Sequence, residues 1–152
     1  MRTSLCWTLV GPILLVGGLL LGCDQVSAPP DRAPPTVADL NVTPDSVNAA
    51  ALPPDLVSDS VAQVPLEVSA AASDPDGTIE RVVFTFEPAS VPAGAAFGEL
   101  QPTEDGRYGR EFSVTVPATR DEVYSLRVFA VDSDSLASNQ VTGQFRFVPA
   151  SE

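Results

Sequence analysis

Carboxylates supply most of the reactive side chains in this 152-residue chain, which has 20 acidic residues, two cysteines and no histidine. All eight basic residues are arginine. The chain therefore lacks the usual general base, and it has neither the lysine nor the glycine-rich loop of a phosphate site. Paired carboxylates cleave glycosidic bonds in some enzymes, but no pair here is set in an evident pocket. The composition predicts a protein that is not an enzyme.

Cys23 follows an uncharged apolar segment that runs from Leu5 to Gly22, with Arg2 ahead of it. A positive start followed by an apolar stretch is typical of an export signal. Glycines and a proline interrupt the segment, which disfavours a permanent membrane-spanning helix. An uncleaved signal anchor is the alternative, because about 18 apolar residues are the minimum for a span. Both readings place the remaining chain outside the cytoplasm, since Arg2 favours an N-terminus inside.

The apolar segment ends in Leu20-Leu21-Gly22-Cys23, which resembles the lipobox of bacterial lipoproteins. The resemblance implies that residues 1–22 are a removed signal peptide and that Cys23 carries lipid on its sulfur and on its freed amine. Each buried methylene contributes about 0.8 kcal/mol, so two or three chains hold a protein on a bilayer essentially permanently. We therefore expect lipid anchoring in the cell membrane or outer membrane, with the domain facing the periplasm or the exterior.

The charge of the chain bears on its partners. Removal of Arg2 takes the formal net charge from −12 to −13. Such a surface repels the phosphate backbone of nucleic acids, and it offers few basic residues to anionic lipid. We expect no nucleic-acid partner, and we expect lipid on Cys23, not surface charge, to hold the protein at the membrane. Because Cys6 lies in the leader, no intrachain disulfide is expected.

Residues 23–36 form a proline-rich segment with no apolar periodicity. Pro29-Pro30 and Pro34-Pro35 favour the extended polyproline conformation. This segment is predicted to be a tether that spaces the following domain from the bilayer. A proline-rich docking site for another protein is the alternative.

After the tether, apolar and polar residues alternate in short runs, which is typical of half-buried antiparallel strands. The apolar positions of five such runs are Leu66, Val68 and Ala70; Val82, Phe84 and Phe86; Phe112, Val114 and Val116; Tyr124, Leu126, Val128 and Ala130; and Val141, Phe145 and Phe147. Turn sequences separate the runs at residues 74–77, 92–94, 105–106 and 132–138. Further strands are expected within residues 37–42 and near residues 55–61.

Three stretches resemble the immunoglobulin-like modules of bacterial surface proteins, a group that includes fibronectin type III, PKD and cadherin-like domains. They are VSAAASDPDGTIERVV from Val68, EDGRYGREFSVTVP from Glu104, and VYSLRVFAVDSDSLASNQV from Val123. The resemblance implies an all-β fold, a single antiparallel sandwich of about seven strands over residues 37–149, with residues 150–152 as a tail. The mature chain has no tryptophan and no cysteine pair, which excludes antibody-type domains. Tyr124 stands where such folds have their tyrosine-corner residue.

In modules of this kind, the loop after the second strand and the loop before the last strand emerge at the same end. The resemblance thus implies that Asp74, Asp76, Asp132 and Asp134 converge. Four carboxylates are hard oxygen ligands that suit Ca²⁺, and the predicted role of the ion is to stiffen the loops. The alternative is a plain turn, because Asp-Pro-Asp-Gly forms one without any metal.

Two functions are compatible with these features. The first is a membrane-anchored, non-catalytic module that serves binding, adhesion or structural spacing, with another envelope or surface protein as its partner. The alternative is a glycan-binding or glycan-processing accessory domain. A glycan site needs an aromatic platform. Tyr108 and Tyr124 are predicted to point inward, so only Phe97 and Phe129 remain for that purpose.

Overall fold

The segments in which apolar and polar residues alternate form β-strands, because successive residues of a strand point to opposite faces of the sheet. The computed structural model describes residues 32–89 and 96–150. Cys23, the predicted leader, the 92–94 turn and most of the predicted tether lie outside these residues. The described strands are β1 (Thr36–Thr43), β2 (Ser46–Asn48), β3 (Val61–Ser73), β4 (Ile79–Pro88), β5 (Ala96–Pro102), β6 (Tyr108–Pro117), β7 (Glu122–Asp132) and β8 (Val141–Val148).

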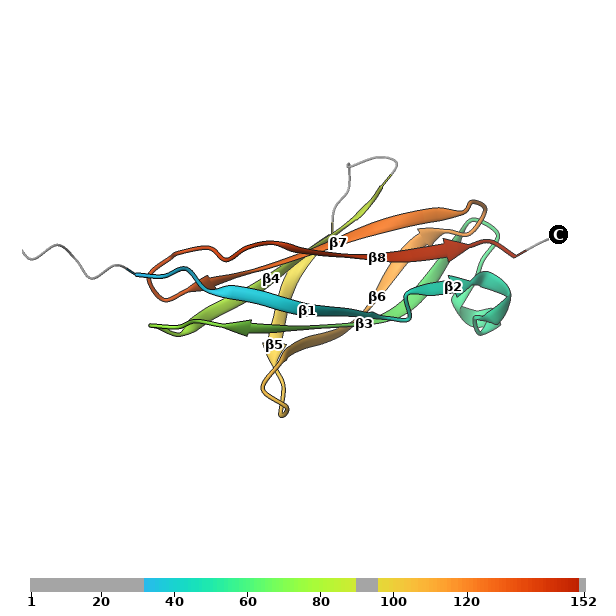
Figure 1. Ribbon diagram of the computed structural model, residues 1–152. Coiled ribbons are helices and arrows are strands. Elements are labelled where there is room, and N and C mark those ends of the chain that lie inside the picture. Colours follow the sequence, from blue (N-terminus) through green and yellow to red (C-terminus); the bar gives the residue numbers. More distant parts are fainter. Residues whose placement is uncertain (1–31, 90–95, 151–152) are drawn as a thin grey trace, which may run out of the picture. The chain divides into compact units, whose positions relative to one another are not determined.

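The eight strands form one sheet in the order β1-β3-β6-β5-β4-β7-β8-β2. All neighbours are antiparallel except β2 and β8. The outermost strands, β1 and β2, are consecutive in the chain and are separated only by Pro44 and Asp45. The chain itself thus joins the two edges, and the sheet is nearly barrel-shaped (Figure 1). The predicted all-β fold is confirmed, whereas two separate sheets are not clearly distinguished.

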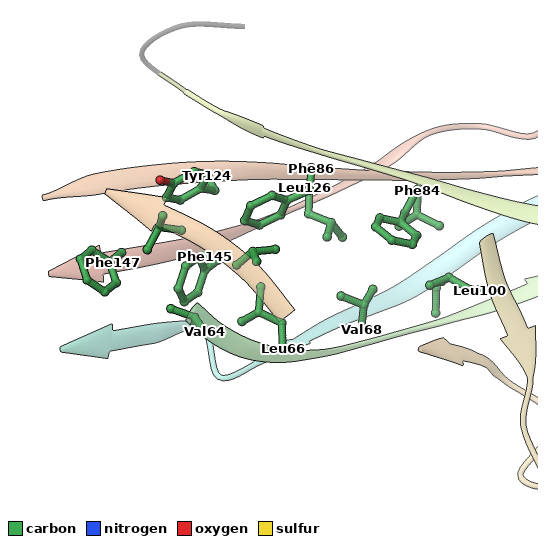
Figure 2. Close-up of a cluster of buried hydrophobic side chains, with 14 of the residues drawn as sticks. Val64, Leu66, Val68, Phe84, Phe86, Leu100, Tyr124, Leu126, Phe145 and Phe147 are labelled. Atoms are coloured by element: carbon green, nitrogen blue, oxygen red, sulfur yellow. The ribbon is translucent and has the colours of Figure 1, made fainter. Parts of the chain in front are cut away.

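The interior is filled by the residues that the alternation places inward. Apart from Phe112 and Val141, which are half-buried at the margin, all the apolar positions of the five predicted runs are buried. Val64 from β3 and Leu100 from β5 complete the cluster (Figure 2). Burial of a large apolar side chain contributes about 1.5–3 kcal/mol, so this shared interior is the main source of stability.

Aromatic rings occupy one part of this interior. The ring of Phe86 stacks on Tyr124 with centroids 4.9 Å apart and an interplanar angle of 7°. Phe145 is tilted against both, at 6.2 Å from Phe86 and 5.9 Å from Tyr124 (Figure 2). Such pairs contribute about 0.5–1.5 kcal/mol beyond the area they bury. They join β4, β7 and β8.

Three local features differ from the sequence-based expectation. Residues 55–61 are not a strand: a 3₁₀ turn, η2 (Pro54–Leu56), occupies their start, and β3 begins only at Val61. A second 3₁₀ turn, η1 (Ala49–Ala51), follows β2. β5 was not predicted at all. In the described part of the chain, no helix is long and apolar enough to cross a membrane.

The described chain begins and finishes at opposite ends of the sheet (Figure 1). Its N-terminal residues contact the β3–β4 turn and the β7–β8 loop, whereas Val148 at the end of β8 pairs with Asn48 of β2. β3 has 13 residues, which at roughly 3.3 Å per residue span about 40 Å. The sheet therefore separates its two termini by a distance of this order.

Candidate functional site

The acidic loops lie side by side at the end of the sheet where the described chain begins. The backbone N–H of Ser133 in the β7–β8 loop donates to the carbonyl of Thr78 beside the β3–β4 turn, at 3.0 Å. Ile79 pairs with Asp132 where the two strands adjoin. The structure thus places both predicted ligand loops at one end, as expected from the sequence.

Asp132 is a buried carboxylate that shapes its own loop. The residue is only 2 % exposed. Its Oδ1 accepts hydrogen bonds from the backbone N–H groups of Asp134 and Leu136, both at 2.8 Å. Ser135 between them has a positive φ of 66°. A buried polar group requires such partners, and here they come from the loop backbone. Asp132 therefore acts as the internal cap of this loop.

Asp134 and Asp76 bind the chain that leads into β1. Asp134 forms an ion pair with the guanidinium of Arg32. The Oδ2 of Asp76 accepts a hydrogen bond of 2.9 Å from the backbone N–H of Ala33. Pro35, which follows, is fully buried. The end of the predicted tether is thus held against both acidic loops.

Asp74 has a different environment. Its Oδ1 accepts a 3.3 Å hydrogen bond from the backbone N–H of Asp76, which forms the turn expected for Asp-Pro-Asp-Gly. Its Oδ2 is shielded from solvent and has no hydrogen-bond partner among the described residues. A Cβ at Gly77 would lie only 2.6 Å from that oxygen. A larger residue at position 77 would therefore require the carboxylate of Asp74 to move.

The four aspartates are thus brought to one end of the sheet, but each is engaged with its own loop or with the chain before β1. Among residues 32–89 and 96–150, no group of three or more acidic, cysteine or histidine side chains has an arrangement that could hold a metal ion. The Ca²⁺ site stays a prediction. The hydrogen bonds that form the two turns already explain why aspartate stands at these positions.

No family model matches this chain, and no curated protein matches it. The site is therefore judged on its own contacts.

A groove that the sequence did not reveal lies on the outer face of β5, β4 and β7. Val83 of β4 stands opposite Glu99 of β5 on one side and Phe129 of β7 on the other. The groove has a volume of about 450 Å³ and is lined by Arg81, Val83, Phe97, Gly98, Glu99 and Phe129. The sequence identified Phe97 and Phe129 as exposed rings, but the groove required β5, which was not predicted.

Gly98 brings this part of β5 close to its neighbours. A Cβ at position 98 would lie 2.9 Å from the ring of Phe84 and 3.0 Å from a guanidinium nitrogen of Arg110. That same side chain of Arg110 donates to the backbone carbonyl of Glu99 at 3.4 Å. A glycine inside a strand often marks such a close approach, and here it allows β5 to lie over the core.

The opposite end of the domain carries two acidic residues paired with arginine. Asp121 receives two hydrogen bonds from Arg146, at 3.0 and 2.5 Å, and these hold the pKa of Asp121 below its ordinary value. Glu122 is buried and pairs with Arg120 at 2.6 Å. These ion pairs balance charge at the β6–β7 turn and on the neighbouring strand β8.

Proposed function

We propose that this protein is a lipoprotein whose lipid-modified Cys23 holds a non-catalytic, immunoglobulin-like module outside the cytoplasm, where it serves binding or structural spacing. The single observation that carries the proposal is the sequence Leu20-Leu21-Gly22-Cys23 at the end of an uncharged apolar segment. Lipid at that cysteine explains how so acidic a chain is retained at a bilayer.

The strand order supports the immunoglobulin-like part of the proposal. One run of neighbours is β1-β3-β6. The other is β5-β4-β7-β8, and the three-residue β2 adds to its outer edge beside β8. β5 pairs with β4 over five residues, but it pairs with β6 only through Gln101 and Pro102. The connection between the two runs is therefore narrow. Three strands facing four is the arrangement of a fibronectin type III-like sandwich, in the broad group that shares this architecture.

The position of the termini supports a spacing role. The chain enters the sheet beside the acidic loops, through contacts of Arg32 and Ala33, and β8 leads away to the other end (Figure 1). A domain with this connectivity carries its far end away from the point where the tether joins it. The end that bears Asp121, Arg120 and Arg146 would then face away from the bilayer.

Glycan binding is the second candidate function, and one observation favours it. The exposed Phe97 and the half-buried Phe129 both line the groove on β5, β4 and β7, and a sugar-binding face requires accessible aromatic rings. A monomer that binds a glycan through these two rings would favour this second function.

Mass spectrometry of the mature N-terminus tests the anchor. The expected result is a first residue, Cys23, whose mass is increased by a diacylglyceryl group and an acyl chain. A mature protein that retains residues 1–22, or that begins with an unmodified residue, would contradict the proposal.

A further inference from the structure

Phe97 is the most exposed large apolar side chain that the structure describes. It is 81 % exposed, whereas Val61, the next such residue, is 41 % exposed. Phe97 lies in the groove beside the half-buried Val83 and Phe129. An exposed aromatic ring beside an apolar hollow is the usual centre of a protein–protein interface, where aromatic residues are enriched and the rim is polar.

The charges in this groove are balanced. Arg81 and Glu99 both line it, and within the described residues neither side chain takes part in an ion pair. Arg127, on the same outer face of β7, pairs with Glu87 of β4 at 3.0 Å. The groove therefore holds one free cation and one free anion, in a chain whose formal net charge is −12.

We propose that this face of β5, β4 and β7 is an interface between two copies of this chain, related by a two-fold axis. A surface that carries one cation and one anion can pair with a second copy of itself. A two-fold axis places the cation of each copy against the anion of the other, so the same contact forms twice. Arg81 of each copy faces Glu99 of the other, and Phe97 of each copy packs against the apolar groove of the other.

The acidic character of the chain favours this face for a second copy over the outer face of β3 and β6. On the outer side of β3 and β6, Glu67 stands directly opposite Glu111, and a second copy there would meet like charges. Charges more than about 8 Å from an interface are largely screened at physiological ionic strength. The balanced face on β5, β4 and β7 is thus where two such chains approach with little repulsion. The inference goes beyond the proposed function and does not depend on the lipid.

Charge exchange tests the pairing. The full chain, purified in a density-matched detergent, is analysed by sedimentation over a range of concentrations. The wild type is expected to dimerise. Arg81→Glu and Glu99→Arg each place two like-charge pairs in the interface, so each alone should raise the dissociation constant about tenfold or more. Mixed together, the two variants restore both opposite-charge pairs, and they should form a heterodimer close to wild-type affinity.

Two further variants complete the experiment. Phe97→Ala removes the central ring and should weaken the dimer about tenfold or more. Its thermal melting, compared at a concentration where the wild type is monomeric, should stay that of the wild type. Glu111→Arg, which makes the same charge change on the other side of the sheet, should leave dimerisation unchanged. A wild type that is monomeric at every concentration would overturn the inference. So would a mixture of the two charge variants that fails to associate, or a monomer that binds a glycan through Phe97 and Phe129.

Discussion

The side-chain amide of Asn139 makes two hydrogen bonds, each of 2.9 Å, with the backbone of Val37. Its Oδ1 accepts from the N–H of Val37, and its Nδ2 donates to the carbonyl of the same residue. The pair is partly buried and joins residues 102 positions apart. One amide side chain therefore supplies the donor and the acceptor that a neighbouring strand would offer, and it fixes the start of β1 to the β7–β8 loop.

Asn139→Ala should lower the free energy of unfolding by about 1–3 kcal/mol, because it leaves a donor and an acceptor of Val37 without their partners. Asn139→Asp retains the acceptor but sets a carboxylate oxygen against the carbonyl of Val37, so its loss should be no smaller than that of alanine. Urea denaturation measures both. Asn41→Ala is the control, since Asn41 bonds only to the exposed side chain of Thr43 and its loss should stay within about 0.5 kcal/mol. Equal losses for the Asn139 and Asn41 alanine variants would refute this role.

Two phenylalanines separate the core from the outer face. Phe145 is fully buried and Phe97 is 81 % exposed. Phe145→Ala should destabilise the domain by about 3–5 kcal/mol, because it removes a large apolar side chain and leaves a cavity. At a concentration where the protein is monomeric, Phe97→Ala should change the free energy of unfolding by no more than about 0.5 kcal/mol. Thermal and chemical denaturation of the two variants, made in parallel, decide the matter. The account fails if Phe97→Ala is as destabilising as Phe145→Ala.

Tyr124 makes stability depend on alkaline pH. Burial raises the pKa of its phenol, and the charge of Glu122 raises it further. The folded state therefore disfavours the phenolate, whereas the unfolded chain ionises near the ordinary value of about 10. The contribution is fully present below that pH and is lost as the pH rises through the higher pKa of the folded state.

The expected result is that Tyr124→Phe flattens the loss of stability above about pH 10. Absorbance titration of the folded wild type should show Tyr124 ionising at a higher pH than a free tyrosine, and the variant should lack that step. If Tyr124 ionises at the ordinary value while the protein is still folded, the argument from burial is wrong.

Calcium binding remains a prediction of the acidic loops. A bound ion would compete with Arg32 for Asp134, since these two residues form an ion pair. If the four loop aspartates bind Ca²⁺, calorimetric titration of the wild type gives heat and the melting temperature rises. Arg32→Gln should then bind more tightly, because it removes the competing cation. The absence of heat and of any melting shift in both proteins would eliminate the site.

The alternation of side chains predicted the interior because it depends only on neighbouring residues. β4 and β7 each turn one apolar face inward. All the apolar residues predicted to point inward are buried: Val82, Phe84 and Phe86 in β4, and Tyr124, Leu126, Val128 and Ala130 in β7. The convergence of the acidic loops could likewise be predicted, because it followed from the resemblance to a known architecture. The contacts of Asp134 and Asp76 with Arg32 and Ala33 could not, since these partners are far away in sequence.

Other elements could not be predicted because they depend on distant partners. β2 has three residues and owes its extended form to pairing with β8, whose partner residues lie 100 positions later. β5 contains Gly98, which weakens a strand pattern. Pro65 has no N–H to donate and interrupts the pattern of β3. It is tolerated because β1 leaves β3 after Thr43 pairs with Glu67, and beyond that point no described strand pairs with this edge of β3.

Membrane fractionation of a Cys23→Ser variant tests whether lipid on Cys23 holds the protein at the membrane. The wild type should sediment with membranes and stay there in high salt, since lipid chains and not charges retain it. The serine variant cannot be alkylated on sulfur, so it should be found free of membranes after the same treatment. A serine variant that still sediments with membranes in high salt would contradict the account.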